Sequence, residues 1–236
     1  MKMELDRIWE NDIYGLLESA RAIQKGHFVG TSGRHLDTYI DKDALGVDTP
    51  TMEKLAFELA HRLDDRLGLA SGKKKVDAII GAPMGAIALA SRVAFHLGSI
   101  CAKDGKFLTI PSLYAEKTGD GNLRIRGAFV KHLKNGADVI SIEDILNTGG
   151  TAEEMLRVIR EVGGNPIAVG AICNRGGVTN TNWGKVEIVS LLNLNLNSFP
   201  ASECPLCTGG VPIRTDLGHG AKFLAEQRVA PNEQPK

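Results

Sequence analysis

Two adjacent acids and a loop rich in glycine and threonine follow an apolar run near the middle of the sequence. The run spans residues 139–142, the acids are Glu143 and Asp144, and the loop reads Asn147-Thr148-Gly149-Gly150-Thr151-Ala152. The paired glycines let backbone N–H groups converge, and the helix that starts here favours a phosphate at its N-terminus. The acids suit the neighbouring hydroxyls of a sugar, because carboxylates accept hydrogen bonds. The pattern predicts a sugar-phosphate site, whereas an ordinary strand–turn–helix has no need of two consecutive acids.

Short apolar runs alternate with helical patterns along the chain, which is typical of an α/β fold with a mostly parallel sheet. We expect strands at residues 76–80, 107–110, 139–142, 167–173 and 186–192, a short strand near 38–41, and helices at 3–24, 49–67, 86–97 and 152–162. Thr49 as cap, Pro50 in the first turn and Gly68 at the end mark the helix at 49–67 most clearly. Ligands of such sheets bind beyond the carboxyl ends of the strands, where Glu143 and Asp144 fall.

The composition is that of an ordinary globular protein. Lysine plus arginine and aspartate plus glutamate number 28 each, so the net charge is zero and no nucleic-acid partner is expected. No apolar run approaches the roughly 20 residues that cross a bilayer, so no membrane partner is expected either. Residues 1–7 carry acids and no apolar core of a secretory signal. These features predict a cytoplasmic protein.

Three further segments, taken with residues 139–152, resemble a known family. They are residues 26–35 with Tyr39-Ile40-Asp41, residues 81–90, and Cys204-Pro205-Leu206-Cys207 followed by Gly210-Val211-Pro212-Ile213. In this order they resemble the type I phosphoribosyltransferases, and within them the orotate branch. The resemblance runs from about residue 26 to residue 213.

The resemblance implies an enzyme that transfers the phosphoribosyl group of 5-phosphoribosyl-1-pyrophosphate (PRPP) to orotate. The products would be orotidine 5′-monophosphate and pyrophosphate, in pyrimidine nucleotide biosynthesis. It implies the type I phosphoribosyltransferase-like fold as one domain, with residues 49–194 as the PRPP-binding core. Residues 1–48 and 195–236 would form a small hood. A homodimer is implied, as is Mg²⁺ carried mainly by the substrate, so that no metal ligands are assigned to the protein.

Roles follow residue by residue from the same resemblance. Glu143 and Asp144 would hold the ribose hydroxyls and act in catalysis together with Lys117. The loop formed by Asn147, Thr148, Gly149, Gly150, Thr151 and Ala152 would bind the 5′-phosphate, and Met84, Gly85 and Ala86 would face pyrophosphate. Arg175 falls where the family presents an arginine to the orotate carboxylate, which suits a guanidinium fork. Thr31, Arg34, Tyr39, Ile40 and Thr148 would complete the base site, partly through backbone groups.

The sequence departs from the family most in the segment 114–126, which is rich in glycine and charge and is expected to be a surface loop. The family usually carries several basic residues there, but only Lys117 precedes the glycines, with Glu116 and Thr118 beside it. Lys117 would reach the pyrophosphate of a neighbouring subunit, or else pair with Glu116 at the surface. Gly85 and Asn147 also replace a lysine and a threonine of some members. Phosphoribosyl transfer to another base, or PRPP binding by a non-catalytic regulator, therefore stays open.

Cys204 and Cys207 form a CxxC pair, which is half of the usual set of four zinc ligands. No second pair is present, so a metal site would have to be completed across a dimer or by His219. The alternative is a structural turn without metal, which we take as the expectation.

Overall fold

The structure is a computed structural model that describes residues 12–30, 32–181, 183–194 and 196–229. Its strands are β1 (Ile23–Val29), β2 (His35–Ile40), β3 (Ala78–Gly81), β4 (Ser112–Lys117), β5 (Leu123–Ile125), β6 (Asp138–Leu146), β7 (Asn165–Asn174), β8 (Glu187–Asn193) and β9 (Ser198–Phe199). Its helices are α2 (Lys42–Val47), α3 (Thr49–Leu67), α4 (Ile87–Ile100), α5 (Gly127–Val130), α6 (Gly150–Glu161), α7 (Pro205–Thr208) and α8 (Gly220–Val229). A helix over residues 12–19 precedes β1.

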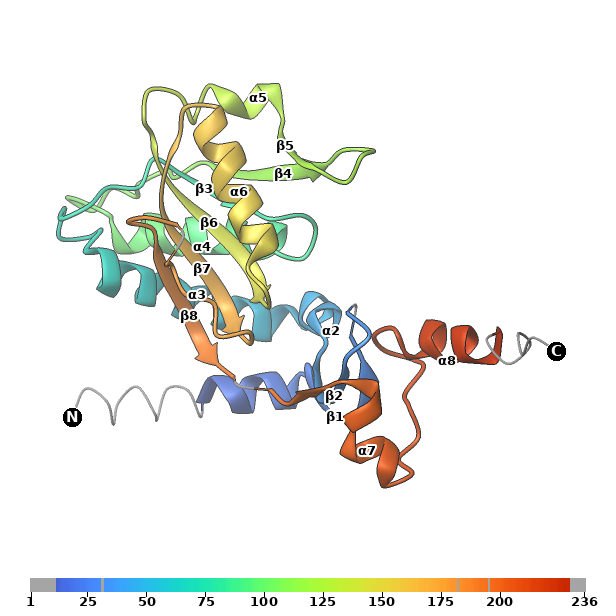
Figure 1. Cartoon of the computed structure of the whole chain (residues 1–236). Helices are drawn as coiled ribbons and strands as arrows, with labels where there is room; N and C mark the ends of the chain where they lie inside the picture. The colour runs from blue at the N-terminus through green and yellow to red at the C-terminus, as the bar shows by residue number, and fades with distance from the viewer. Residues whose placement is uncertain (1–11, 31, 182, 195, 230–236) are drawn as a thin grey trace.

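Six strands form the central sheet, in the order β5-β4-β3-β6-β7-β8. All neighbours run parallel except β4 and β5, so the α/β fold expected from the sequence is confirmed. Helix α6 covers one face of this sheet, and α3 and α4 cover the other (Figure 1). The central strands β6 and β7 are buried along most of their length, which explains their nearly continuous apolar sequences.

Helix α3 shows how the sequence signals act locally. Its buried positions repeat at helical spacing and line the face that packs on the sheet. Gly68 ends the helix in the left-handed conformation, with φ 68°, as expected. The cap is Asp48 rather than Thr49, because the Asp48 carboxylate accepts the backbone N–H of Thr51 at 3.1 Å.

A second, smaller sheet joins the two ends of the chain. Its order is β1-β2-β9, so the N-terminal hairpin pairs with a strand from near the C-terminus. The register places His35 opposite Phe199. Figure 1 shows this sheet with α7 and α8 at one end of the molecule, beyond the carboxyl ends of β6, β7 and β8.

Three expected elements differ from the structure. The N-terminal helix stops near residue 19, because Arg21 adopts φ 57° and the chain enters β1 at Ile23. Residues 107–110 are not a strand: Phe107 packs on Phe95, and the Leu108 N–H donates to the carbonyl of Gly98. The apolar side chains of that run therefore cover the end of α4, and the strand begins after it.

The expected surface loop at 114–126 is instead mainly a hairpin of β4 and β5. Leu113, Ala115, Leu123 and Ile125 are buried at alternate positions, the spacing of strands with one face on the core. The polar residues form the tip, where the Asp120 carboxylate accepts hydrogen bonds from Asn122. Among the residues that the structure describes, no helix is long and apolar enough to cross a membrane.

Candidate active site

Glu143 and Asp144 lie near the carboxyl end of the central strand β6. Asp144 is 9% exposed, and its Oδ1 accepts the backbone N–H of Ile145 at 2.7 Å. Its Oδ2 lies 3.4 Å from the ammonium Nζ of Lys42. The acid expected to hold a ribose is therefore fixed by the backbone on one side and by a cation on the other.

Burial is the largest influence on the pKa of Glu143. Burial and the neighbouring charge of Asp144 raise the pKa of Glu143 to about 8, although Lys42 and Lys117 oppose the shift. A carboxyl group with this pKa is largely protonated at neutral pH, so it can donate one hydrogen bond as well as accept others. Together with the carboxyl group of Asp144 beside Lys42, this group suits two hydroxyl groups side by side.

The loop after β6 encloses a small cavity of about 60 Å³. The cavity is lined by Glu143, Ile145, Leu146, Asn147, Thr148, Gly149, Gly150, Thr151 and Ala152. Gly149 adopts φ 84° and caps α6, and a Cβ there would come within 3.0 Å of Val178. Glycine thus allows the tight turn that aims the first N–H groups of α6 into the cavity. The expected phosphate residues are brought together as one cradle.

The segment expected to face pyrophosphate meets the acids directly. A Cβ on Gly85 would lie 1.8 Å from Asp144 Oδ2, so this position admits no side chain without displacing the acid. Ala86 is buried at the start of α4, and the side chain of Met84 is exposed. Gly85 therefore lets the turn after β3 approach Asp144.

Lys42 is a site residue that the sequence argument missed. It begins α2, whose cap is Asp41, and it reaches the acids from the small sheet. Asp144 is the main cause that raises the pKa of Lys42, so the ammonium charge is held there. The same hypothetical Cβ on Gly85 would lie 3.5 Å from the Lys42 side chain. The available signal was its place directly after Tyr39-Ile40-Asp41, in a segment already assigned to the base site.

Arg175 follows the neighbouring strand β7 and lies against the phosphate loop. Its backbone N–H donates to the carbonyl of Leu146 at 2.8 Å, and a Cβ on Gly176 would lie 1.5 Å from the carbonyl oxygen of Asn147. Burial lowers the pKa of Arg175, and burial raises the pKa of Tyr39 while the charge of Arg175 opposes that rise. The charge of Arg175 therefore acts on Tyr39 across the two sheets.

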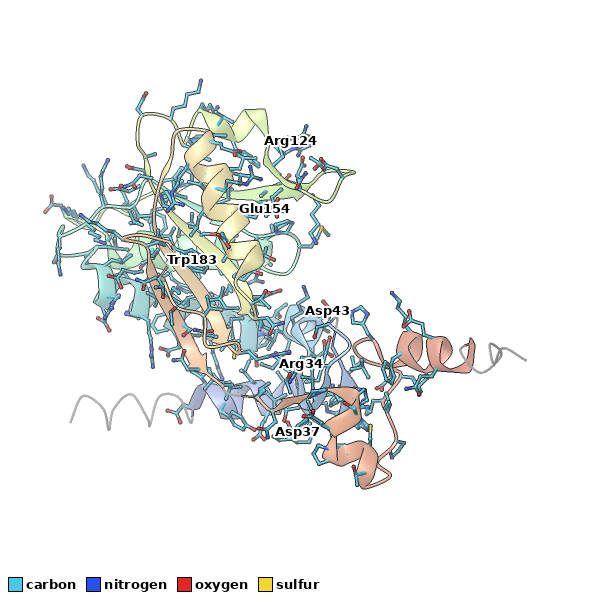
Figure 2. The ribbon with its side chains drawn as sticks, in the orientation of Figure 1. Arg34, Asp37, Asp43, Arg124, Glu154 and Trp183 are labelled. Carbon is cyan, nitrogen blue, oxygen red and sulfur yellow. The ribbon has the colours of Figure 1, made fainter. Side chains whose placement is uncertain are left out.

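The remaining residues expected at the base site differ in what they contact and in how far they are buried. The guanidinium of Arg34 donates to the Oγ and the carbonyl of Ser198, both at 2.5 Å, so it ties β2 to β9 (Figure 2). The side chain of Ile40 is buried in the core, which leaves only its backbone for a ligand. Thr31 lies outside the described residues, and Thr148 lines the phosphate cavity.

Lys117 ends β4 and is exposed, and its charge reaches Glu143 of its own chain. The alternative pairing of Lys117 with Glu116 is not what the structure contains. Glu116 binds Arg126 at 2.9 Å and Arg124 at 3.7 Å. Consecutive strand residues point to opposite faces, so Glu116 turns away from the side that Lys117 occupies.

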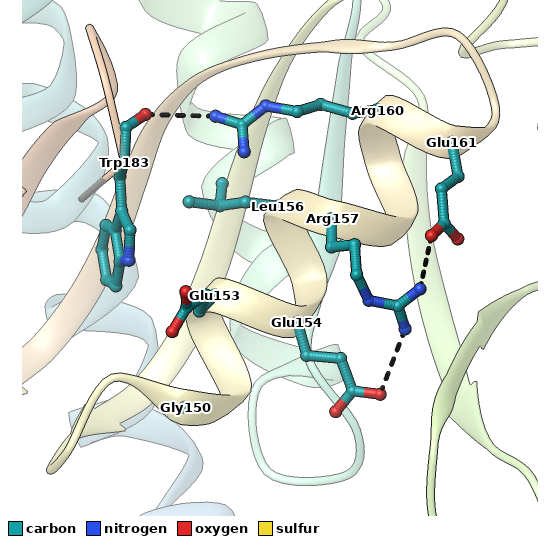
Figure 3. Close-up of a pocket in the computed structure, with 8 residues that line it drawn as sticks. All are labelled: Gly150, Glu153, Glu154, Leu156, Arg157, Arg160, Glu161 and Trp183. Carbon is teal, nitrogen blue, oxygen red and sulfur yellow. Dashed lines mark hydrogen bonds and ion pairs between the residues drawn. The ribbon is translucent and has the colours of Figure 1, made fainter.

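A larger hollow runs along the outer face of α6 (Figure 3). Arg157 pairs there with Glu154 and Glu161, and Arg160 donates to the carbonyl of Trp183. Its cations are thus already engaged by the protein. Only Gly150 is shared with the phosphate cradle.

Comparison with known proteins agrees with this geometry. Residues 47–198 match the family described as phosphoribosyl transferase domain. The orotate phosphoribosyltransferase of Thermotoga maritima is 30% identical over 211 residues, covering 88% of this chain and 98% of that protein. The one of Caldanaerobacter subterraneus subsp. tengcongensis is 29% identical over 215 residues, covering 89% and 96%.

A solved structure gives the same fold. The crystal structure of orotate phosphoribosyltransferase from Aeropyrum pernix superposes with a TM-score of 0.57 at 21% identity, covering 77% of this chain and 93% of that one. The phosphate cradle, the paired acids and all six strands of the central sheet lie within the matched residues 47–198. The chain belongs to the phosphoribosyltransferase family.

Proposed function

We propose that this chain is an orotate phosphoribosyltransferase, which converts PRPP and orotate to orotidine 5′-monophosphate and pyrophosphate. The observation that carries the proposal is the position of Arg175. It is a half-buried cation whose backbone bonds to the end of β6 just before the phosphate loop, and its charge acts on Tyr39 of the small sheet. A guanidinium fork in this position suits the carboxylate of a base such as orotate. Named relatives of this activity align over most of the chain, which supports the same choice.

The neighbouring groups would divide the binding of PRPP among them. The cradle of residues 147–152 takes the 5′-phosphate, and Glu143 and Asp144 take the two ribose hydroxyls. The turn of Met84, Gly85 and Ala86 takes pyrophosphate. Arg175 takes the carboxylate of orotate, and the base site is completed by Tyr39, the backbone of Ile40, Thr148, Thr31 and Arg34.

In the reaction, a ring nitrogen of orotate attacks C1 of the ribose as the bond from C1 to pyrophosphate breaks. The main contribution of the protein is to hold the nitrogen and the leaving group in line on opposite sides of C1. Lys117 and Lys42 bring positive charge to the side where pyrophosphate departs, and this charge stabilises the transition state as negative charge develops. We propose that Lys117 serves the pyrophosphate of a neighbouring subunit in the homodimer, as the family resemblance implies.

Mg²⁺ fits the donor set only as an ion shared with the substrate. Asp144 offers one carboxyl group beside Lys42, and Glu143 with its pKa of about 8 is a poor ligand at neutral pH. Asp144 would hold the ion together with oxygens of PRPP and water. When bound, Mg²⁺ neutralises part of the charge of the leaving pyrophosphate.

The wider assignments rest on the same family likeness. We propose a cytoplasmic homodimer that serves pyrimidine nucleotide biosynthesis and uses small-molecule substrates alone. We further propose that residues 1–48 and 195–236 act as the hood over the base and that residues 49–194 bind PRPP.

Pyrophosphate release tests the proposal directly. The protein is incubated with PRPP and Mg²⁺ together with orotate, uracil or adenine in parallel. We expect pyrophosphate with orotate and little with the other two, because neither bears a carboxylate. Release with adenine instead would assign the chain to another base. PRPP binding without release for any base would favour the regulatory alternative.

A further inference from the structure

Four potential metal ligands converge inside the small sheet. They are His27 of β1, His35 of β2, Cys204 just before α7 and Cys207 within α7. Their ligand atoms all lie within 4.8 Å of one another, although the two pairs are far apart in sequence. His27, His35 and Cys204 are each 1% exposed, and Cys207 is exposed. We propose that these four side chains bind one structural zinc ion.

The distances agree with a tetrahedral zinc centre. Zinc lies ~2.3 Å from a cysteine sulfur and ~2.0 Å from a histidine nitrogen, so the edges of its tetrahedron measure about 3.3 to 3.8 Å. His27 Nε2 lies 3.6 Å from Cys204 Sγ and 3.7 Å from Cys207 Sγ, and Cys207 Sγ lies 3.3 Å from His35 Nδ1. Of these four distances, the 2.7 Å between His27 Nε2 and His35 Nδ1 is the one below that range, and the other ligand atoms lie within 4.8 Å of one another. That edge would have to widen on binding.

A hydrogen bond outside the cluster orients His27 for this role. The carbonyl oxygen of Val211 lies 2.7 Å from His27 Nδ1 and can only accept, so Nδ1 carries the proton. His27 Nε2 then faces the two sulfurs and His35. Histidines that bind zinc commonly donate their other N–H to a carbonyl group in this way.

The donor set indicates the kind of ion and the kind of site. Two thiolates and two imidazoles are the ligands of closed, four-coordinate zinc sites, which leave no position for a substrate. Such an ion would act on the structure. It would link the N-terminal hairpin to the C-terminal segment, in addition to the pairing of β2 with β9 and the N–H of Arg214 on the carbonyl of His27.

The first measurement is the metal content of the full chain, purified without an affinity tag and under reducing conditions. We expect about one zinc ion per chain by mass spectrometry. Chelation should lower the melting temperature, and Zn²⁺ but not Mg²⁺ should restore it. Co²⁺ added to the chelated protein should give the sulfur-to-cobalt absorption of a tetrahedral site. No substrate is involved, so the result does not depend on the proposed function.

Matched cysteine variants locate the ion. Cys204→Ser and Cys207→Ser should lose zinc, whereas Cys101→Ser should keep it, because Cys101 is also a free cysteine but lies at the end of α4. If Cys204→Ser does not fold, the proposal is still tested by Cys207→Ser, which changes an exposed residue, and by the cobalt spectrum of the parent protein. The proposal is overturned if the reduced parent protein binds neither Zn²⁺ nor Co²⁺. Zinc retained by both cluster variants, or a Cys204–Cys207 disulfide in the protein as isolated, would overturn it equally.

Discussion

The two sheets of this molecule place polar groups in the interior by different means. At the carboxyl ends of the central strands, Asp144 and the phosphate loop come from one continuous stretch, and the backbone of β6 and α6 orients them. In the small sheet, His27 and Cys204 are separated by 177 residues and only the tertiary fold brings them together. The first region is open and suited to a substrate. The second is largely buried and suited to an ion that joins two parts of the chain.

The geometry of the two regions is maintained by different interactions. A site within one strand–loop–helix unit keeps its geometry as long as that unit is packed, and the apolar core supplies the packing. A site assembled from both ends of the chain depends on the contact itself. Loss of a charged group at the first should therefore alter chemistry, and loss of a ligand at the second should alter stability. The following substitutions probe the first region, both its charged groups and the packing of its loops.

The largest effect is expected from Asp144→Asn. The substitution removes the ionised acceptor for the ribose and the partner of Lys42, so turnover should fall by at least ~100-fold and PRPP affinity should weaken. Calorimetry with PRPP and a pyrophosphate assay measure the two effects. Asp138→Asn, at the opposite end of the same strand, is the control and should stay active. Unchanged PRPP affinity in Asp144→Asn would contradict the site assignment.

Lys117→Ala should lower kcat on the order of 10- to 100-fold, with a smaller change in KM for PRPP, because a cation beside the leaving group acts as charge develops. Lys131→Ala, which removes an exposed lysine after α5, is the matched control.

Mixing Lys117→Ala with Asp144→Asn tests which subunit Lys117 serves. If each site uses its own lysine, mixed dimers gain no activity. Recovered activity would mean that the lysine crosses to the partner.

Gly176→Ala should disturb two loops at once. Its Cβ would overlap the carbonyl oxygen of Asn147, so the Arg175 segment and the phosphate loop cannot both keep their places. We expect a loss of about 1–3 kcal/mol in the free energy of unfolding, measured with urea. Gly119→Ala is the control, because nothing lies within 4 Å of that Cβ. Equal stability of the two variants would show that the loops are less closely joined than described.

A further effect concerns pH and Glu143. Its pKa of about 8 in the folded protein lies above its ordinary value of 4.5, so the folded state holds the extra proton between these values. The free energy of unfolding should therefore decrease as the pH rises from about 5 to about 8. In Glu143→Gln that decrease should become shallower, whereas Glu226→Gln, on the exposed surface of α8, should match the parent. Parallel curves for all three proteins would argue against a raised pKa.

Much of the first region was predictable because its signals are local. The order of strands and helices, the buried face of α3 and the loop of Gly149 and Gly150 all follow from neighbouring residues. The hairpin of β4 and β5 was missed because charge and glycine at its tip masked the alternation of Leu113, Ala115, Leu123 and Ile125. The run 107–110 was mistaken for a strand because its apolar residues pack on a helix end.

The groups that were missed come from distant parts of the chain. Lys42 meets Asp144 across 102 positions, and the histidines meet the CxxC pair across more than 160. The sequence offered the CxxC pair as half of a metal site and His27 and His35 as parts of another motif. No spacing rule joins residues so far apart, because their contact is decided by how β2 pairs with β9.

The affinity of Arg175→Ala for orotate and for PRPP, measured by calorimetry in the same preparation, tests the central claim most directly. Orotate should bind on the order of 100-fold more weakly, because its carboxylate loses a half-buried ionic partner, while PRPP should bind as before. Arg66→Ala, which removes an exposed arginine paired with Glu187, should change neither affinity. Orotate binding at the parent affinity by Arg175→Ala would contradict the proposed function.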